Sequence, residues 1–73
     1  MGCGEEIKLR RKTLAISQRD LAEMADVGLA TIKDIERGKG NPSLSTISRI
    51  LDVLGMEVLF RVRDGNYSWR LND

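Results

Sequence analysis

The chain has 73 residues, enough for one small domain near the lower size at which an apolar core folds without disulfides or metals. Hydrophobic residues make up 41% of it and charged residues 32%, a balance typical of a globular chain rather than a disordered one. It has no histidine, one cysteine and a net charge of +1. We therefore expect no enzymatic activity, no bound metal or cofactor and no internal disulfide. The net charge alone does not predict nucleic-acid binding.

The first twelve residues, MGCGEEIKLRRK, carry charges and no apolar run. Such a segment predicts neither a signal peptide nor a membrane span. The single cysteine also fits a reducing compartment. We therefore predict a soluble cytoplasmic protein without membrane association.

The spacing of apolar residues predicts a first helix from Glu5 to about Thr13. Ile7 and Leu14 lie two turns apart on its inward side, and Leu9 lies near them. Lys8, Arg10, Arg11 and Lys12 form a basic run, which is expected to be a solvated face of this helix.

A second helix begins after Ser17, because SQRD is a Ser-x-x-acid capping pattern. Leu21, Met24 and Ala25 follow at i, i+3 and i+4, which predicts a narrow inward stripe. The sequence ADVG ends this helix, and Asp26 is the expected left-handed residue, since aspartate tolerates that conformation better than most residues.

A third helix is predicted from about Leu29 to Glu36, with Gly28 as an acceptable if weak N-cap and Gly38 as its end. Ser43 then caps a fourth helix, which Gly55 ends. The apolar face of this fourth helix is expected to consist of Leu44, Ile47, Ile50, Leu51 and Leu54.

From Met56 onward the apolar pattern changes from helical to alternating, which predicts a strand. Asp-Gly between two alternating runs is a strong hairpin signal. A turn at Asp64-Gly65 would set Val62 opposite Tyr67, Phe60 opposite Trp69 and Val58 opposite Leu71. A frayed polar tail is the alternative, and the sequence leaves the two open.

Residues 17–55, SQRDLAEMADVGLATIKDIERGKGNPSLSTISRILDVLG, closely resemble the lambda-repressor-like, or Xre-type, DNA-binding domain. The most specific pieces are Gln18, LA at 21–22, TI at 31–32, IERG at 35–38, NPSL at 41–44 and LG at 54–55. The resemblance implies a mainly α fold, with a four-helix DNA-binding domain over residues 1–55 and a dimerisation segment over residues 56–73. Asp26 departs from the glycine of many members, at modest cost to the turn.

In lambda-repressor-like domains the third helix enters the major groove of double-stranded DNA. Carried over position by position, the DNA-contacting residues are expected to be Gln18, Arg19, Gly28, Leu29, Ala30, Thr31, Lys33, Asp34, Lys39, Asn41 and Ser43. Leu29 and Ala30 would meet thymine methyl groups, and Lys33 would bind a guanine. Arg11 and Glu36 match a structural ion pair that ties the first helix to the end of the third. Residues 41–43 are explained equally well as a simple turn and cap.

The segment LGMEVLFRV is similar to the corresponding part of HipB-like antitoxins, where a strand pairs with its mate from a second subunit. That similarity implies a homodimer. The dimerisation residues would be Val58, Leu59, Phe60, Arg61 and Val62. Two-fold symmetry would place the recognition helices about 34 Å apart on a near-palindromic operator.

These expectations lead to a homodimeric transcriptional repressor, and within that class to an antitoxin that also binds a HipA-like kinase toxin. A free-standing regulator with the same fold is the alternative. A protein-interaction module that does not bind DNA is a third class. Four residues argue against that third class, because they lie where a DNA reader needs them: Gln18, Lys33, Lys39 and Asn41.

Overall fold

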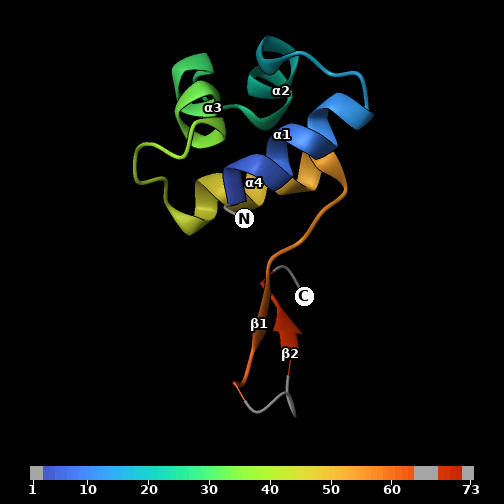
Figure 1. Cartoon of the computed structure of the whole chain (residues 1–73), viewed down its shortest axis with the longest axis vertical. Helices are drawn as coiled ribbons and strands as arrows, with labels where there is room; N and C mark the ends of the chain where they lie inside the picture. The colour runs from blue at the N-terminus through green and yellow to red at the C-terminus, as the bar shows by residue number, and fades with distance from the viewer. Residues whose placement is uncertain (1–2, 64–67, 72–73) are drawn as a thin grey trace.

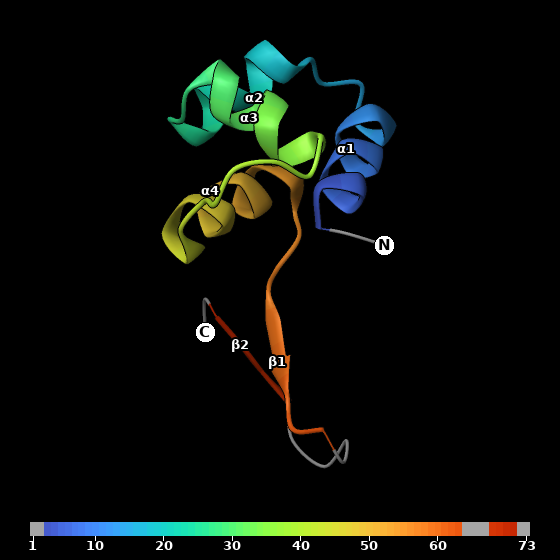
Figure 2. The ribbon, with the colours of Figure 1, turned by 60° about the vertical axis from the view of Figure 1, so that its left-hand side comes forward.

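The computed structural model describes residues 3–63 and 68–71. The described residues form four helices and two strands: α1 Cys3–Thr13, α2 Gln18–Ala25, α3 Leu29–Glu36, α4 Leu44–Leu54, β1 Leu59–Arg61 and β2 Ser68–Arg70. The helices make a head from which the strands project, with α2 and α3 at the opposite end of the molecule (Figures 1 and 2). This mainly helical architecture confirms the predicted fold class. Within the described ranges, no helix combines the length and apolar character needed to cross a bilayer.

The helix boundaries follow the capping residues predicted from the sequence. Ser17 Oγ accepts a hydrogen bond from the Asp20 amide at 2.9 Å, and Ser43 Oγ accepts one from the Thr46 amide at 3.0 Å. Asp26 ends α2 in the left-handed region at φ 56°, as predicted. Side-chain oxygens at N-caps satisfy amides that the helix itself leaves without partners.

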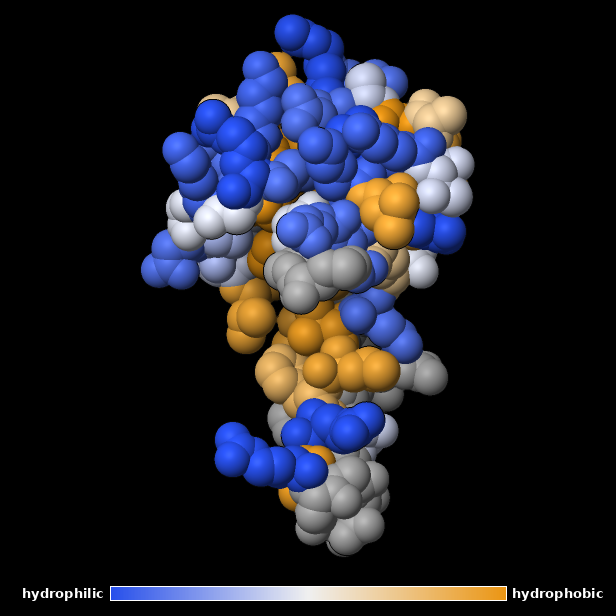
Figure 3. Space-filling model, in the orientation of Figure 1, coloured by the Kyte–Doolittle hydropathy of each residue, from blue (hydrophilic) through white to orange (hydrophobic). Residues whose placement is uncertain are grey.

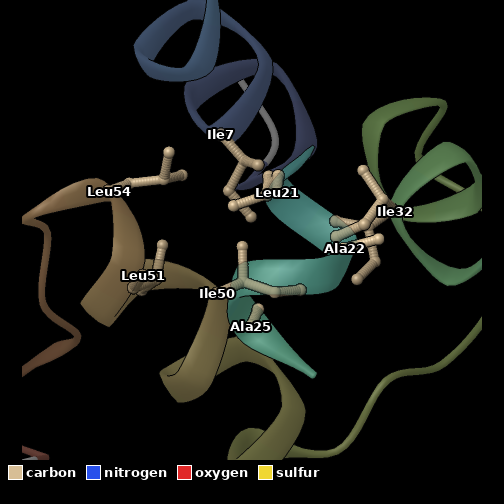
Figure 4. Close-up of a cluster of buried hydrophobic side chains, with 9 residues drawn as sticks. Ile7, Leu21, Ala22, Ala25, Ile32, Ile50, Leu51 and Leu54 are labelled. Carbon is tan, nitrogen blue, oxygen red and sulfur yellow. The ribbon is translucent and has the colours of Figure 1, made fainter. Parts of the chain in front are cut away.

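Apolar side chains from all four helices pack together in a single core. Five large side chains are almost completely excluded from solvent: Ile7, Leu21, Ile32, Ile50 and Leu54. Ile7 comes from α1, Leu21 from α2, Ile32 from α3, and the other two from α4 (Figure 4). Because α2 and α3 share this core with α1 and α4, their relative angle is fixed by packing.

The predicted inward face of α1 is wrong in part, since Leu9 is 59% exposed and Leu14 is 39% exposed. The helix begins at Cys3, earlier than predicted, and its buried residues are Gly4, Ile7 and Arg11. These follow an i, i+3, i+7 spacing that turns Leu9 toward solvent.

Two further apolar residues predicted to be inward are also exposed, Met24 at 62% and Leu44 at 56%. On α2 the buried stripe runs through Leu21, Ala22 and Ala25, so Met24 lies beside it rather than on it. Leu44 stands in the first turn of α4, whereas the buried residues of that helix begin only at Ile50.

The chain after α4 forms the predicted hairpin. β1 and β2 pair antiparallel, with Phe60 opposite Trp69, and Val58 O accepts a hydrogen bond from the Leu71 amide at 2.9 Å. Both relations match the predicted register. The predicted Asp64-Gly65 turn and the partner of Val62, Tyr67, lie outside the described residues. In the described part of the chain, β1 pairs with β2 on one edge and with nothing on the other.

Candidate nucleic-acid interface

α3 is held by its inner side and presents its outer side to solvent. Ile32, Ile35 and Glu36 are buried beneath it. The turn from α2 is tight, because the Val27 amide bonds to Ala22 O at 3.0 Å and Gly28 begins α3 in an extended conformation. Two helices joined in this way project the first turn of the second helix outward.

None of the predicted DNA-contacting residues is buried. Exposed members of the set are Arg19, Gly28, Ala30, Lys33, Lys39, Asn41 and Ser43, and half-buried members are Gln18, Leu29, Thr31 and Asp34. They lie at the start of α2, along α3 and in the loop before α4, and hydrophilic side chains cover this end of the head (Figure 3). The surface is therefore available to a large polar ligand.

The start of α3 offers mainly small groups. Ala30 is exposed, while Leu29 packs in part against the core, which leaves only some of its side chain for a ligand. A Cβ atom at Gly28 would lie 3.6 Å from Thr31 Oγ1, an ordinary contact, and the backbone angles φ −69° and ψ 147° suit any residue. The fold therefore does not require glycine at position 28.

A pocket of about 200 Å³ lies between α3 and the loop that follows it. It is lined by Thr31, Asp34, Ile35, Gly40, Asn41 and Pro42. Three predicted contact residues thus meet here, Thr31, Asp34 and Asn41. The Asp34 carboxylate forms an exposed ion pair with Arg37, one helical turn further on, which offsets its negative charge on this surface.

The loop before α4 is shaped by Gly38 and Gly40, which have φ angles of 74° and 80°. Its Lys39 amide bonds to Asp34 O at 2.7 Å, so the loop is tied to the end of α3. Ser43 Oγ accepts from the Thr46 amide and donates to Thr46 Oγ1, both at 3.0 Å. The Ser43 hydroxyl therefore caps α4, as predicted by the interpretation of residues 41–43 as a turn and cap.

Behind the surface, Arg11 and Glu36 form a buried ion pair. Arg11 Nε lies 2.7 Å from Glu36 Oε2 and Arg11 Nη2 lies 3.0 Å from Glu36 Oε1. Burial alone raises the pKa of Glu36, but hydrogen bonds from Arg11 and Gln18 outweigh it, and the pKa lies below its ordinary value. The hydrogen bond to Glu36 likewise holds the pKa of Arg11 above its ordinary value.

Residues 7–60 match the helix-turn-helix family. The chain belongs to this family. It is 41% identical over 58 residues to an immunity repressor protein of Bacillus phage phi105, covering 80% of this chain and only 40% of that protein. It is also 41% identical over 51 residues to an uncharacterized HTH-type transcriptional regulator of Methanothermobacter thermautotrophicus, covering 70% of this chain and 74% of that one.

Solved structures of helix-turn-helix proteins have the same fold. The restriction-modification controller C.AhdI from Aeromonas hydrophila superposes with a TM-score of 0.71 at 28% identity, over 74% of this chain and 82% of that one. SinR, a master regulator for biofilm formation solved in complex with DNA, superposes with a TM-score of 0.67 at 35% identity, over 73% and 86%. These relatives are regulators, which confirms the prediction of a non-enzymatic protein.

The hairpin residues lie apart from this helix-turn-helix surface. Leu59 and Val62 are 56% and 43% exposed, and Val58 packs in part against the core. Apolar side chains form a band where the chain leaves the head toward the strands (Figure 3). The structure thus separates the two predicted sites to opposite ends of the molecule (Figure 1).

Two arginines make contacts that were not predicted from the sequence. Arg37 pairs with Asp34, and the i, i+3 spacing of opposite charges could have revealed it. Arg10 Nε donates to Leu54 O at 2.9 Å, which ties α1 to the last turn of α4 just before the chain leaves the head. That contact spans 44 positions and has no local sequence signal.

Proposed function

We propose that this protein is a DNA-binding transcriptional repressor of the cytoplasm that reads the major groove with α3. The observation that carries the proposal is the outward face of α3, whose predicted contact residues all reach solvent while Ile32 and Ile35 anchor the helix from behind. A structure of SinR, 35% identical, contains DNA, which supports the same use of the fold here.

Base reading would depend on close approach more than on bidentate hydrogen bonds. Gly28 and Ala30 allow the backbone near the base edges, and the exposed parts of Ala30 and Leu29 meet thymine methyl groups. Lys33 supplies the hydrogen bond to a guanine. A helix that makes few bidentate pairs draws part of its specificity from DNA deformability, so each half-site is read with modest specificity.

Affinity would come mainly from the DNA backbone. Arg19 and Lys39 are exposed cations, and Asn41 stands exposed between Lys39 and the N-terminus of α4. Amides at the starts of α2 and α4 can add contacts to phosphates. Such binding weakens steeply with added salt.

A gel shift with duplex DNA of random sequence tests this proposal, because backbone contacts need no particular operator. We expect a shift at low salt that disappears as salt is raised. A protein that leaves the duplex unshifted at low salt is instead a protein-interaction module. Selection from a random pool would then define the operator, and a long half-site dominated by guanine contacts would contradict the proposed reading.

The proposed repressor is a homodimer joined through β1 and the residue on each side of it, which gives Val58, Leu59, Phe60, Arg61 and Val62. A two-stranded hairpin is marginal by itself in water, and a second copy on the unpaired edge of β1 would extend the sheet. Two-fold pairing implies a near-palindromic operator. The strands and α3 lie at opposite ends of the molecule (Figure 1). The spacing between the two half-sites therefore depends on the angle between the hairpin and the helical head. A monomer at micromolar concentration in sedimentation would contradict the dimer.

A second candidate is an antitoxin that also restrains a HipA-like kinase toxin. The strand that follows Gly55 favours it, because the segment LGMEVLFRV is similar to the dimer strand of HipB-like proteins. A kinase-like reading frame beside this gene would support the antitoxin. Its absence would leave the free-standing repressor, the role named for the phage relative.

A further inference from the structure

One carboxylate gathers hydrogen bonds from two other helices. Glu36 Oε1, at the end of α3, accepts from Arg11 Nη2 of α1 at 3.0 Å and from Gln18 Nε2 of α2 at 3.2 Å. Glu36 Oε2 accepts from Arg11 Nε at 2.7 Å. The side chain of Glu36 keeps 2% of its exposure, so this carboxylate is a fixed internal group.

The hydrogen bond to Glu36 fixes the orientation of the Gln18 amide. A carboxylate only accepts hydrogen bonds, so the nitrogen end of the amide must face it. An amide nitrogen carries two N–H groups, and one of them is used here. Gln18 is half-buried and makes no second side-chain hydrogen bond within the described residues, which leaves the other N–H for a ligand.

The cluster has no net charge, although a carboxylate lies near the surface proposed to meet phosphates. Arg11 binds both oxygens of Glu36 and offsets its charge. Arg11 Nη1 also donates to Ile16 O at 2.8 Å, just before the Ser17 cap. The same ion pair therefore holds both the backbone that leads into α2 and the first side chain of α2.

We propose that Glu36 is a positioning residue for DNA binding, which holds the Gln18 amide so that its free N–H meets a phosphate of the duplex. The inference rests on the proposed function, since it needs DNA at the start of α2. Gln18 would contact the phosphate, and Glu36 would act through Gln18 without touching DNA. Holding the side chain before binding reduces the entropy lost when the contact forms.

A double-mutant cycle tests the coupling. The first background is the unaltered protein, and the second is Arg11→Met/Glu36→Met, which removes both charges at once so that neither is left buried and unpaired. Gln18→Met, which keeps the length of the side chain but removes the amide, is made in each background. Fluorescence anisotropy measures binding to a labelled random-sequence duplex of about 20 base pairs at about 50 mM salt. Thermal unfolding confirms that each variant is folded.

We expect Gln18→Met to weaken binding roughly tenfold in the unaltered protein and less than about twofold in the second background. An equal loss in both backgrounds would overturn the role of Glu36. No loss in either background, with the duplex still bound, would also overturn the inference while leaving the proposed function intact. If the unaltered protein does not bind the duplex, the proposed function itself fails.

An NMR measurement on the unaltered protein decides the matter should the double variant not fold. Gln18 is the only glutamine in the sequence, so its side-chain amide signals are assigned without ambiguity. We expect their heteronuclear NOE to match that of the α2 backbone, as it does for a side chain that is held in place. A side-chain NOE of Gln18 far below that of the α2 backbone would contradict positioning by Glu36.

Discussion

Arg11 and Glu36 are 25 positions apart in the sequence and form a bidentate ion pair with distances of 2.7 and 3.0 Å. Their side chains retain only 10% and 2% of their exposure. Removing one partner from such a pair leaves an uncompensated buried charge, which costs far more stability than the loss of a surface ion pair. Because the pair joins α1 to the end of α3, it also supports the surface proposed to read DNA.

Arg11→Met should lower the free energy of unfolding by about 3–5 kcal/mol. Arg37→Met is the matched control, because it breaks the exposed pair with Asp34, whose side chains are 61% and 45% exposed. That control should cost less than about 1 kcal/mol. Urea denaturation measures both values. Equal losses for the two variants, or Arg11→Met losing DNA binding while keeping full stability, would contradict the structural role of the pair.

The free energy of unfolding should fall at acidic pH, because the pKa of Glu36 is lowered in the folded protein. A lowered pKa means that the carboxylate stabilises the fold above its ordinary value of 4.5, and that this contribution is lost as the pH falls through the lower folded value. Glu36→Gln should therefore remove part of the drop in stability below pH 4.5. Glu23→Gln removes the same charge at an exposed position, and this variant should keep the drop in stability. Denaturation midpoints across pH 2–7 measure the difference, as proton linkage requires.

Gly4→Ala should destabilise the head, since a Cβ atom at Gly4 would lie 2.0 Å from Ile35 O. The contact is with backbone, so α1 must move away from the end of α3, at a cost of about 1–3 kcal/mol. Gly28→Ser is the control, because a Cβ atom there would make only an ordinary contact, 3.6 Å from Thr31 Oγ1, and serine is a good N-cap. Thermal unfolding compares the two. A Gly4→Ala variant as stable as Gly28→Ser would refute this close approach of α1 and α3.

Gly28→Ser should affect folding and DNA binding in opposite directions. Serine is a slightly better N-cap than glycine, so the free energy of unfolding should rise by a few tenths of a kcal/mol. The added side chain would occupy the space through which the backbone approaches DNA, and binding should weaken roughly tenfold. Thermal unfolding and duplex anisotropy measure the two effects. Unchanged affinity would show that DNA does not come close to position 28.

Local signals in the sequence were sufficient for the ends of α2, α3 and α4, but not for the start of α1. They also gave the register of the hairpin, although they left open whether the hairpin forms. Ser17, Asp26 and Ser43 determine backbone geometry within a few residues of themselves, so their effects can be read without the fold. Alternation likewise set Phe60 opposite Trp69. These predictions needed only the neighbouring residues.

Features that depend on how the helices meet were not predicted. Met24 and Leu44 are apolar at helical spacing yet exposed, because the width of a buried stripe depends on the neighbouring helices. Burial of Gly4 depends on the approach of Ile35 from a distant helix. The hydrogen bond from Gln18 to Glu36 has the same origin, so a residue expected to contact DNA was not foreseen to touch the ion pair.

Charge reversal on α3 tests most directly whether its outer face binds DNA. Lys33→Glu places a negative charge on the exposed side of α3, and Arg49→Glu makes the same change on the exposed side of α4, between the α2–α3 end and the hairpin. With a random-sequence duplex at low salt, we expect Lys33→Glu to weaken binding more than about tenfold and Arg49→Glu less than about threefold. Equal effects of the two changes, or no binding by the unaltered protein, would contradict recognition through α3.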